Sequence, residues 1–469
     1  MVSPPRLAAY RALLAVDTGH ADLPAALAHA RASLPDERDR ALAGEITTGT
    51  LRWQGALDAL IAHFAGRPLS RLDREVLIVL RLSAYQLLHL TRIPVSAATN
   101  EAVMLVRQIR KTSAAGLVNA VLRSLLRARG KLPLPPAPGP EMVAGIKEDP
   151  AARAAALDYL SVTLSHPRWL AARWLDRYGF DAAARWEQFN NAAAPLTLRA
   201  NTLTTTAAEV AGTLQGVGIS TTPSSYAPDG LVVTHGNPLL TPLAETGDFL
   251  IQDEASQLVA LLASLYQGPR TLDCCASPGG KTTAIAAAAR GEGLIVAADV
   301  RPGRLALLRR TVERSGARSV RLAQLDAGQP LPFQADTFDL VLIDAPCSGL
   351  GTIRRDPEIR WRRTEADLAR FAAAQRRMLH HAAGVVRPGG HLVYATCSSE
   401  PEENDEVVAA FLAEHATFSL LDVRSTHPPP GLSQVLDEGG VLRTSPLAHG
   451  LEAFFGAVLR RMMTPLAEL

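Results

Sequence analysis

Thr271-Leu-Asp-Cys-Cys-Ala-Ser-Pro-Gly-Gly-Lys-Thr282 shows most directly how the second half of this chain folds. It begins as a short apolar strand, passes through a turn with two consecutive glycines, and enters an alanine-rich helical segment. The glycines let the backbone approach a ligand closely, and the start of a helix offers free N–H groups. This order is typical of a ligand-binding turn that opens a doubly wound α/β sheet.

Strands and helices alternate from this turn toward the C-terminus. A parallel, Rossmann-like sheet is the arrangement that such alternation predicts, and its ligands bind at the carboxyl ends of the strands. We expect strands at Thr271–Cys275, Leu294–Val300, Ser319–Asp326, Phe338–Ala345 and His391–Thr396, with helices at Thr282–Arg290, Arg304–Ser315 and Glu365–Val386.

The N-terminal part differs, because residues 5 to about 129 place apolar side chains at helical spacing. A proline-rich stretch follows, and then a mixed region in which Pro195–Thr202 alternates like a strand. We therefore predict an all-α domain at 1–135, a linker at 136–144, a small α+β insert at 145–265 and the Rossmann-like α/β domain at 266–469.

Composition narrows the class of protein. The chain has 469 residues, 47% of them hydrophobic, which fits several globular domains. Residues 1–140 hold 18 Lys and Arg against 10 Asp and Glu, so this part is a candidate for meeting a polyanion. The four cysteines form no C-x-x-C pair and no His is spaced for zinc, so we expect no metal. Without a signal peptide or a transmembrane stretch, we expect a reduced, cytoplasmic protein.

The cofactor is inferred by exclusion. A P-loop needs glycine six residues before its lysine, where this chain has Cys275, and G-x-G-x-x-G is absent. Asp299 lies 19 residues after Gly280, close to the roughly 20 residues at which a carboxylate accepts hydrogen bonds from a ribose. Asp326 ends the next expected strand, where it would face an adenine. An acidic pocket suits cationic S-adenosylmethionine better than a nucleoside triphosphate.

Two further motifs follow expected strands: Asp344-Ala-Pro-Cys-Ser-Gly-Leu-Gly351 and Tyr394-Ala-Thr-Cys-Ser-Ser399. If the strands are neighbours, about 4.8 Å apart, Cys347 and Cys397 face one cleft. A lone cysteine is usually a small buried hydrophobe, and a disulfide is the other alternative. Two cysteines beside a ligand-binding turn favour a role of the thiols in catalysis instead.

Carbon 5 of cytosine is a poor nucleophile, and a thiolate explains how it could react. Addition of the thiolate to carbon 6 makes carbon 5 enamine-like, so that it can attack a sulfonium methyl group. A base must then remove the C5 proton before the thiol leaves, which is covalent catalysis. A carboxylic acid near N3 would stabilise the adduct.

With these motifs in this order, and with Thr-Cys-Ser followed by Pro401-Glu-Glu-Asn404, the chain resembles the RsmB/Sun group of RNA cytosine-C5 methyltransferases. The resemblance implies that Cys397 is the nucleophile and that Cys347 assists proton removal or product release. It also implies a cofactor site, with Asp344 near cofactor, cytosine or both. Its residues are Cys275, Ala276, Ser277, Pro278, Gly279, Gly280, Lys281, Asp299, Asp326 and Asp344.

The N-terminal domain resembles the RNA-binding antitermination factor NusB at Tyr85-Gln86-Leu87, Asn100-Glu101-Ala102 and Val118–Arg123. A fused module of this kind implies small-subunit (16S) ribosomal RNA as the substrate. We expect no membrane partner, and we expect the protein to be a monomer. A tRNA cytosine-C5 methyltransferase and a non-catalytic RNA-binding or ribosome-assembly factor remain the alternatives.

Two departures from the family pattern stand out. Ser277 replaces a frequent alanine, and Glu452-Ala453-Phe454-Phe455 replaces Asp-Gly-Phe-Phe before an expected late strand, so the geometry of that turn is open.

Overall fold

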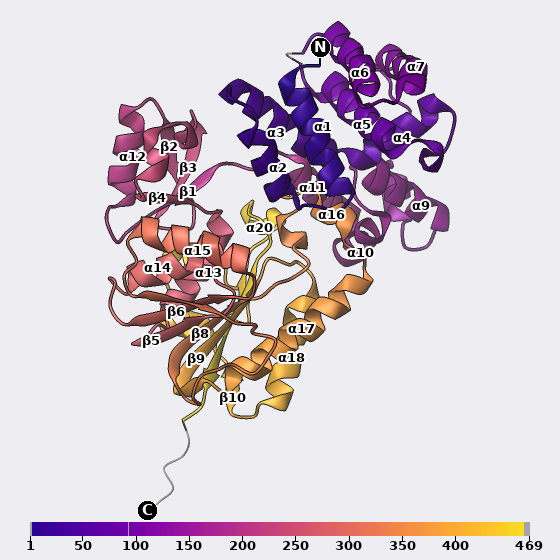
Figure 1. The fold of residues 1–469 in the computed structure, drawn as a ribbon. Helices are drawn as coiled ribbons and strands as arrows, with labels where there is room; N and C mark the ends of the chain where they lie inside the picture. The colour runs from indigo at the N-terminus through magenta and orange to yellow at the C-terminus, as the bar shows by residue number, and fades with distance from the viewer. Residues whose placement is uncertain (1, 92, 464–469) are drawn as a thin grey trace, which may run out of the picture. The chain divides into compact units, whose positions relative to one another are not determined.

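A computed structural model describes residues 2–91 and 93–463 (Figure 1). The chain divides into two compact units. One comprises Met1–Ala193 together with Ile353–Glu365, and the other comprises Ala194–Thr352 and Ala366–Leu469. Within the described residues, no helix combines the length and the hydropathy needed to cross a membrane.

The first unit is helical, as the apolar spacing predicted. Some of its helices begin at a side-chain cap: the Asp22 carboxylate accepts a hydrogen bond from the Ala25 amide, 3.0 Å away, at the start of one of them. The first seven are α1 (Pro4–Asp17), α2 (Leu23–Ala32), α3 (Glu37–Arg52), α4 (Gln54–Ala65), α5 (Arg74–His89), α6 (Val95–Gln108) and α7 (Ala115–Arg127).

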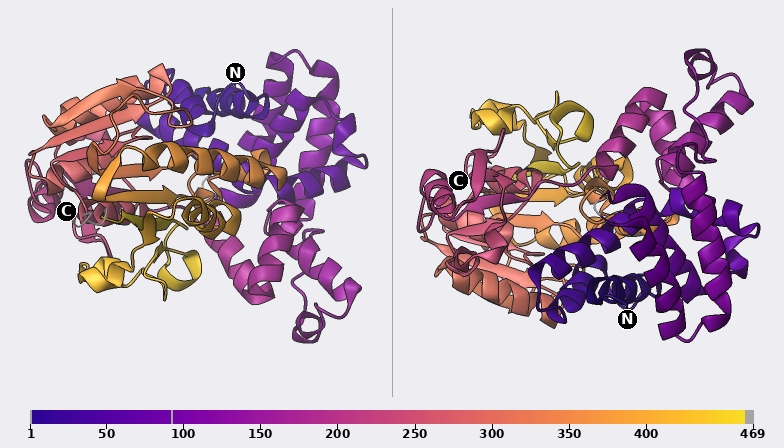
Figure 2. Two further views of the ribbon diagram at one scale, coloured as in Figure 1. Left: turned by 90° about the horizontal axis from the view of Figure 1, so that it is seen from below. Right: turned by 90° about the horizontal axis from the view of Figure 1, so that it is seen from above.

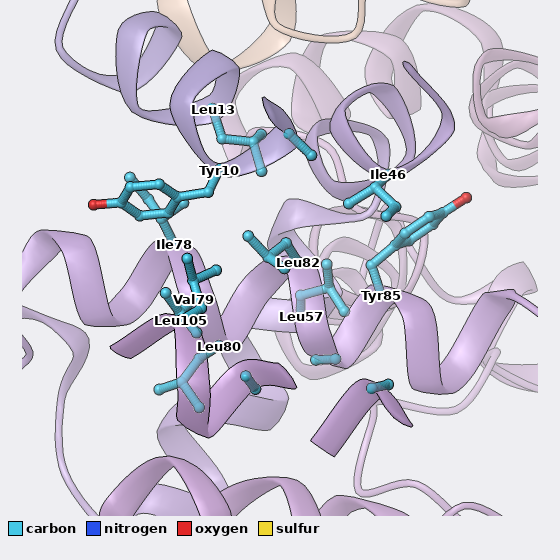
Figure 3. Close-up of a cluster of buried hydrophobic side chains, with 14 of the residues drawn as sticks. Tyr10, Leu13, Ile46, Leu57, Ile78, Val79, Leu80, Leu82, Tyr85 and Leu105 are labelled. Atoms are coloured by element: carbon cyan, nitrogen blue, oxygen red, sulfur yellow. The ribbon is translucent and has the colours of Figure 1, made fainter. Parts of the chain in front are cut away.

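The core of these helices is built around α5, whose side chains are buried on several faces (Figure 3). Leu82 and Leu57 are fully buried there. Tyr85 packs where a Cβ on Gly49 would overlap its ring, and its hydroxyl donates to Glu45 at 2.5 Å. Gly49 is therefore required for the close approach of α3 to α5.

Arg6 connects two of the residues that resemble the antitermination factor. Its Nε donates to Gln86 Oε1 at 2.7 Å, and its Nη1 donates to Glu101 Oε1 at 2.7 Å. Arg6 is buried, so these partners satisfy a guanidinium that would otherwise be costly to bury. Gln86 and Glu101 thus anchor the first helix to α5 and α6.

The helical unit continues past the predicted boundary at residue 135. The predicted linker contains α8 (Pro140–Ala144), and residues 145–193, predicted as part of the α+β insert, are helical and belong to this unit. Aromatic packing accounts for this, since Trp174 is fully buried with its ring centroid 5.4 Å from that of Trp186. The helices are α9 (Pro150–Asp158), α10 (Arg168–Tyr178) and α11 (Phe180–Asn191), with a π-helical turn at Tyr159–Thr163.

The segment Ile353–Glu365 follows the Asp344–Gly351 motif but belongs to the helical unit, which the sequence did not predict. It contains the short helix α16 (Ile359–Arg362). Arg360 is fully buried and donates to the carbonyl of Ser165 and the side chain of Asn191, each at 2.9 Å. These bonds satisfy one nitrogen of the guanidinium, whereas its Nε has no hydrogen bond of ordinary geometry among the described residues, and burial lowers the pKa of Arg360 to about 9.

The second unit begins with a small antiparallel sheet in the order β2-β3-β1-β4. Helix α12 begins with a capping box between Thr206 and Glu209, and it contributes Leu214 to a core shared with Leu198 and Leu231. The bounds are β1 (Thr197–Ala200), α12 (Ala207–Gly216), β2 (Ser220–Pro223), β3 (Gly230–His235) and β4 (Phe249–Ile251).

The large sheet has the order β10-β12-β9-β8-β5-β6-β7. Strands β5 to β9 run parallel and β12 enters antiparallel, which confirms the predicted Rossmann-like fold. Its strands are β5 (Arg270–Asp273), β6 (Leu294–Asp299), β7 (Val320–Gln324), β8 (Phe338–Asp344), β9 (Val386–Thr396), β10 (Phe418–Leu420) and β12 (Phe455–Arg461), with β11 (Leu442–Arg443) paired to β12.

Successive residues of β8 point to opposite faces of this sheet and enter separate cores. Leu340 and Leu342 pack with α13, α14 and α15, whereas Val341 and Ile343 pack on the side of α17 and α18 (Figures 1 and 2). The helices of this unit are α13 (Glu254–Ser264), α14 (Gly280–Ala288), α15 (Pro302–Ser315), α17 (Ala366–Ala383), α18 (Asp405–Glu414), α19 (Pro430–Ser433) and α20 (Pro446–His449).

We predict that Arg360→Ala destabilises the helical unit by about 3–5 kcal/mol, because it removes a buried cation and leaves buried acceptors unsatisfied. The five tryptophans of the chain all lie in this unit, so tryptophan fluorescence during urea unfolding reports on it specifically. Arg362→Ala is the matched control on the same helix, because Arg362 is exposed and its loss costs about 1 kcal/mol or less. Equal effects of the two substitutions would contradict the anchoring role of Arg360.

Candidate active site

The carboxyl ends of the central strands carry the residues that the sequence singled out. Asp299 and Asp344 are the last residues of β6 and β8, and Cys397 comes directly after β9. Strands β8 and β9 are neighbours, with Asp344 opposite Ala395. The expected adjacency of the two cysteine-bearing strand ends is therefore observed.

The glycine turn is held between β6 and α15. The Ala276 amide donates to the Ala298 carbonyl at 2.8 Å, and Ser277 exchanges hydrogen bonds with Arg304, each at 3.0 Å. Gly279 has a φ of +110°, and a Cβ there would lie 2.9 Å from Leu308. Glycine is thus required where the turn enters α14.

Arg199, on β1 of the small sheet, braces this turn and is not among the residues predicted from the sequence. It is nearly fully buried and donates to the Gly280 carbonyl, to Gln252 Oε1 at 2.7 Å and to Thr283 Oγ1 at 2.8 Å. Burial lowers its pKa to about 10. The alternation of Pro195–Thr202 predicted this strand. An arginine on an otherwise apolar strand was the available signal that Arg199 has a buried partner.

Lys281 links the glycine turn to the next motif. Its ammonium donates to Asp344 Oδ2 at 2.6 Å and lies 5.8 Å from the centroid of the Phe454 ring. Burial opposes the charge on Lys281, but the Asp344 carboxylate outweighs it and raises the pKa of the lysine. The lysine therefore stays charged although it is largely desolvated.

The sulfurs of Cys347 and Cys397 lie 3.2 Å apart, and both side chains are partly exposed. A hydrogen bond with Cys397 raises the pKa of Cys347, and burial adds to this. The four cysteines, all within the described residues, are free. A close pair of thiols at one strand edge, with one held in its protonated form, suits a nucleophile and a proton-transfer group on one substrate.

The loops that follow β8 and β9 carry Cys347 and Cys397 and are called the two cysteine loops. Gly351 allows them to approach each other closely. Its amide donates to the Cys397 carbonyl at 2.9 Å, and its own carbonyl accepts from the Ala453 amide at 3.0 Å. A Cβ on Gly351 would lie 1.9 Å from the Ala453 oxygen, so no larger residue fits. Ala453 itself has no positive φ, so alanine is accommodated in the turn that the family builds with glycine, and β12 follows as expected.

The acidic strand ends fit a cationic cofactor. Asp273, the last residue of β5, is fully buried; its Oδ2 accepts from Thr282 at 2.6 Å, whereas Oδ1 has no hydrogen bond of ordinary geometry from the described residues. Burial raises the pKa of Asp273 to about 7, against the effect of that hydrogen bond. Asp299 is also buried, beside Arg304. The acidic groups at these strand ends, one of them with a carboxylate oxygen left open, fit a sulfonium cofactor better than a triphosphate.

Most of the predicted site residues therefore converge. The segment Cys275–Lys281, Asp299, Asp344, Cys347 and Cys397 all lie at the same edge of the sheet. Asp326 lies two residues past β7, is exposed, and accepts a hydrogen bond from the Gly328 amide at 2.9 Å. It remains a predicted adenine contact. Asp273 and Arg199 were not among the predicted residues.

A Rossmann-like sheet with this turn and these acidic strand ends is the architecture of an S-adenosylmethionine-dependent methyltransferase. Residues 260–460 match the family described as 16S rRNA methyltransferase RsmB/F. Residues 3–127 match the NusB family, and residues 166–239 match the ferredoxin-like domain of RsmF/B-like methyltransferases.

Relatives extend these matches over nearly the whole chain. Ribosomal RNA small subunit methyltransferase B of Pseudomonas putida is 36% identical over 446 residues, which cover 93% of this chain and 96% of that protein. The probable ribosomal RNA small subunit methyltransferase B of Bacillus subtilis is 33% identical, with 91% of each chain covered. The chain therefore belongs to the 16S rRNA methyltransferase RsmB/F family, and its cofactor is S-adenosylmethionine.

Solved structures agree on the fold. The crystal structure of PH0851 aligns with a TM-score of 0.77 at 25% identity, covering 98% of this chain and 99% of that one. A methyltransferase homologue from Pyrococcus horikoshii aligns with a TM-score of 0.54 at 27% identity, covering 67% of this chain and 100% of that one.

We predict that Asp273 makes the second unit less stable as the pH rises. Its folded-state pKa of about 7 lies above the ordinary 3.8, so the folded protein holds more protons than the unfolded chain between these values. Stability therefore falls as pH rises through this window, by on the order of 1–4 kcal/mol at about 1.4 kcal/mol per pKa unit. Asp273→Asn should be stabilising relative to wild type at pH 8 and much less so at pH 5.

Hydrogen exchange of the β5 and β6 amides, followed by mass spectrometry at both pH values, measures this difference in the second unit. Asp326→Asn serves as the control because Asp326 is exposed. A stability difference for Asp273→Asn that does not change between pH 5 and pH 8 would show that the carboxyl group does not titrate in this range.

Proposed function

We propose that this protein methylates carbon 5 of a cytosine in small-subunit ribosomal RNA, with Cys397 as the covalent nucleophile and Cys347 assisting removal of the C5 proton. One observation carries the proposal: the two sulfurs lie 3.2 Å apart, at the same edge of the sheet as the Lys281–Asp344 ion pair. Neither binding of a cofactor nor methylation of an exocyclic group needs two such thiols.

The reaction uses each thiol once. Cys397 as the thiolate adds to C6 of the cytosine, which forms a C–S bond and raises the electron density at C5. C5 then takes the methyl group that S-adenosylmethionine supplies when bound. Loss of the C5 proton returns an electron pair to the ring, the C6–S bond breaks, and Cys397 leaves with both electrons.

Cys347 rests as a thiol, so it must first release its own proton to solvent before it can accept the C5 proton; its raised pKa then makes the thiolate a stronger base than that of a free cysteine. It lies close enough to Cys397 to reach the same pyrimidine ring. Asp344, held by Lys281, is placed to stabilise the polar edge of the cytosine or the bound cofactor. A carboxylate paired with an ammonium offers both an acceptor and a donor to that edge.

Ribosomal RNA is supported as the substrate by the relatives, which are named for methylation of the small subunit, and by the match of residues 3–127 to the NusB family. The target base must leave its stack, which costs a few kcal/mol and least in a loop or a single strand. A tRNA substrate and a non-catalytic RNA-binding role are the alternatives.

Methyl transfer distinguishes these alternatives directly. The protein is incubated with radiolabelled S-adenosylmethionine and with either small-subunit ribosomal RNA or total tRNA, and the product is mapped by bisulfite sequencing. We expect one cytosine of the ribosomal RNA to resist conversion. Labelling of tRNA alone would identify tRNA as the substrate. Binding of RNA without labelling would favour the non-catalytic role.

We predict that Cys397→Ala abolishes methyl transfer, because no other group replaces the attacking sulfur, while the affinity for S-adenosylmethionine changes by less than about threefold. Calorimetric titration of the cofactor and the methylation assay are run on the same preparation. Near wild-type turnover of this variant would exclude Cys397 as the nucleophile.

We predict that Cys347→Ala accumulates a covalent protein–RNA complex through Cys397, because the methylated adduct forms but its breakdown is slowed. The complex is measured as a band of low mobility that survives boiling in detergent. The double variant Cys347→Ala/Cys397→Ala is the control and should form no such band. A single variant without the band would assign proton removal to another group.

A further inference from the structure

We propose that Glu403 is a positioning residue that clamps the two cysteine loops together, so that Cys347 and Cys397 meet at reacting distance. This assignment deepens the proposed function and rests on it. Glu403 lies in the Pro401-Glu-Glu-Asn404 motif. It precedes α18, and no step of the proposed reaction uses it.

One carboxylate bonds to both loops. Glu403 is fully buried, and its Oε2 accepts from the Ser348 hydroxyl at 2.5 Å and from the Ser398 hydroxyl at 2.6 Å. Its Oε1 accepts from the Ser348 amide at 2.8 Å. Ser348 follows Cys347 in the chain and Ser398 follows Cys397, so each donor is the immediate neighbour of a reacting thiol.

The clamp is itself fixed to the sheet and to α17. Gln375, fully buried on α17, donates both to Glu403 Oε1 and to the Pro346 carbonyl, each at 3.1 Å. The Tyr394 hydroxyl donates to the Glu403 carbonyl at 2.5 Å. Because its backbone and its side chain are both held, Glu403 cannot follow one loop without the other.

A carboxylate is required for geometric reasons. Ser348 and Ser398 present donors to both of its oxygens, and a carboxylate is the side chain of this size that accepts at both. Glutamine keeps the volume but removes the charge, and an amide nitrogen in the place of Oε2 requires both serine hydroxyls to turn from donors into acceptors. After the larger effects of Cys397 and of burial, the charge of Glu403 also raises the pKa of Cys347, in keeping with proton transfer there.

The separation of the sulfurs can be measured without RNA, by closing a disulfide between them. A thiolate of one cysteine attacks 2,2′-dithiodipyridine, which forms a mixed disulfide and releases one thiopyridone. The second cysteine then attacks the protein sulfur of that mixed disulfide, which forms the Cys347–Cys397 bond and releases a second thiopyridone. The reagent is the two-electron oxidant, and absorbance records each release.

We expect wild-type protein to close the disulfide rapidly, and Glu403→Gln to slow the second release by at least about tenfold, because small displacements of paired groups cost large factors in rate. Glu406→Gln is the matched control: Glu406 is exposed in the same segment, and this variant should close within about twofold of wild type. Peptide mapping identifies the bond and separates it from reaction at Cys275. Equal closure rates for Glu403→Gln and wild type would overturn the proposal.

Two further measurements separate positioning from a general loss of structure. In the methylation assay, Glu403→Gln should lower kcat by at least about tenfold while KM for RNA and for S-adenosylmethionine stays within about twofold. Parallel rises of both KM values together with a lower melting temperature would overturn the positioning role. If Glu403→Gln does not fold, Ser398→Ala decides the question, with closure expected to slow by at least about threefold through the loss of one hydrogen bond.

The two proposals can fail separately. If wild-type protein forms no 5-methylcytosine, the proposed function is wrong, but the disulfide comparison still shows whether Glu403 sets the distance between the thiols. If 5-methylcytosine forms and Glu403→Gln closes the disulfide at the wild-type rate, only the role of Glu403 is lost.

Discussion

The parallel pairing of β8 and β9 is the constraint on which the site depends. Parallel neighbours end at the same edge of a sheet, so the loops that follow them start within one strand spacing of each other. Asp344 lies opposite Ala395, and three residues after Asp344 and two residues after Ala395 the chain reaches its two cysteines. The contact between the sulfurs at 3.2 Å follows from this register, and it fails if either strand shifts by one residue.

The charged groups around this contact are either paired with an opposite charge or left available to a ligand. Lys281 and Asp344 neutralise each other across two motifs, whereas one carboxylate oxygen of Asp273 has no hydrogen bond of ordinary geometry from the described residues. Burial makes an unpaired carboxylate costly, and a cationic ligand removes that cost. This edge of the sheet therefore lowers the stability of the free protein and favours binding of the family's cationic cofactor.

Chain connectivity adds a second constraint. The loop that carries Cys347 continues into Ile353–Glu365, which belongs to the helical unit and is anchored there by the buried guanidinium of Arg360. In the opposite direction along the chain, the small sheet contributes Arg199 to the glycine turn. Arg360 and Arg199 thus hold the end of the Cys347 loop and the glycine turn through contacts with residues distant in sequence.

The sequence by itself determined the helical first part, the Rossmann-like order of strands and the convergence of Cys347, Cys397, Lys281 and Asp344, because these follow from local periodicity and from the rule that parallel strands end at one edge. Only the tertiary structure decided that Ile353–Glu365 belongs to the helical unit, that residues 145–193 are part of it, and that Arg199 and Glu403 brace the site. Those features depend on buried polar contacts between residues many positions apart. A local pattern can signal that a charged residue has a buried partner, as the apolar strand around Arg199 does, but it does not identify that partner, because the partner lies many positions away in the chain.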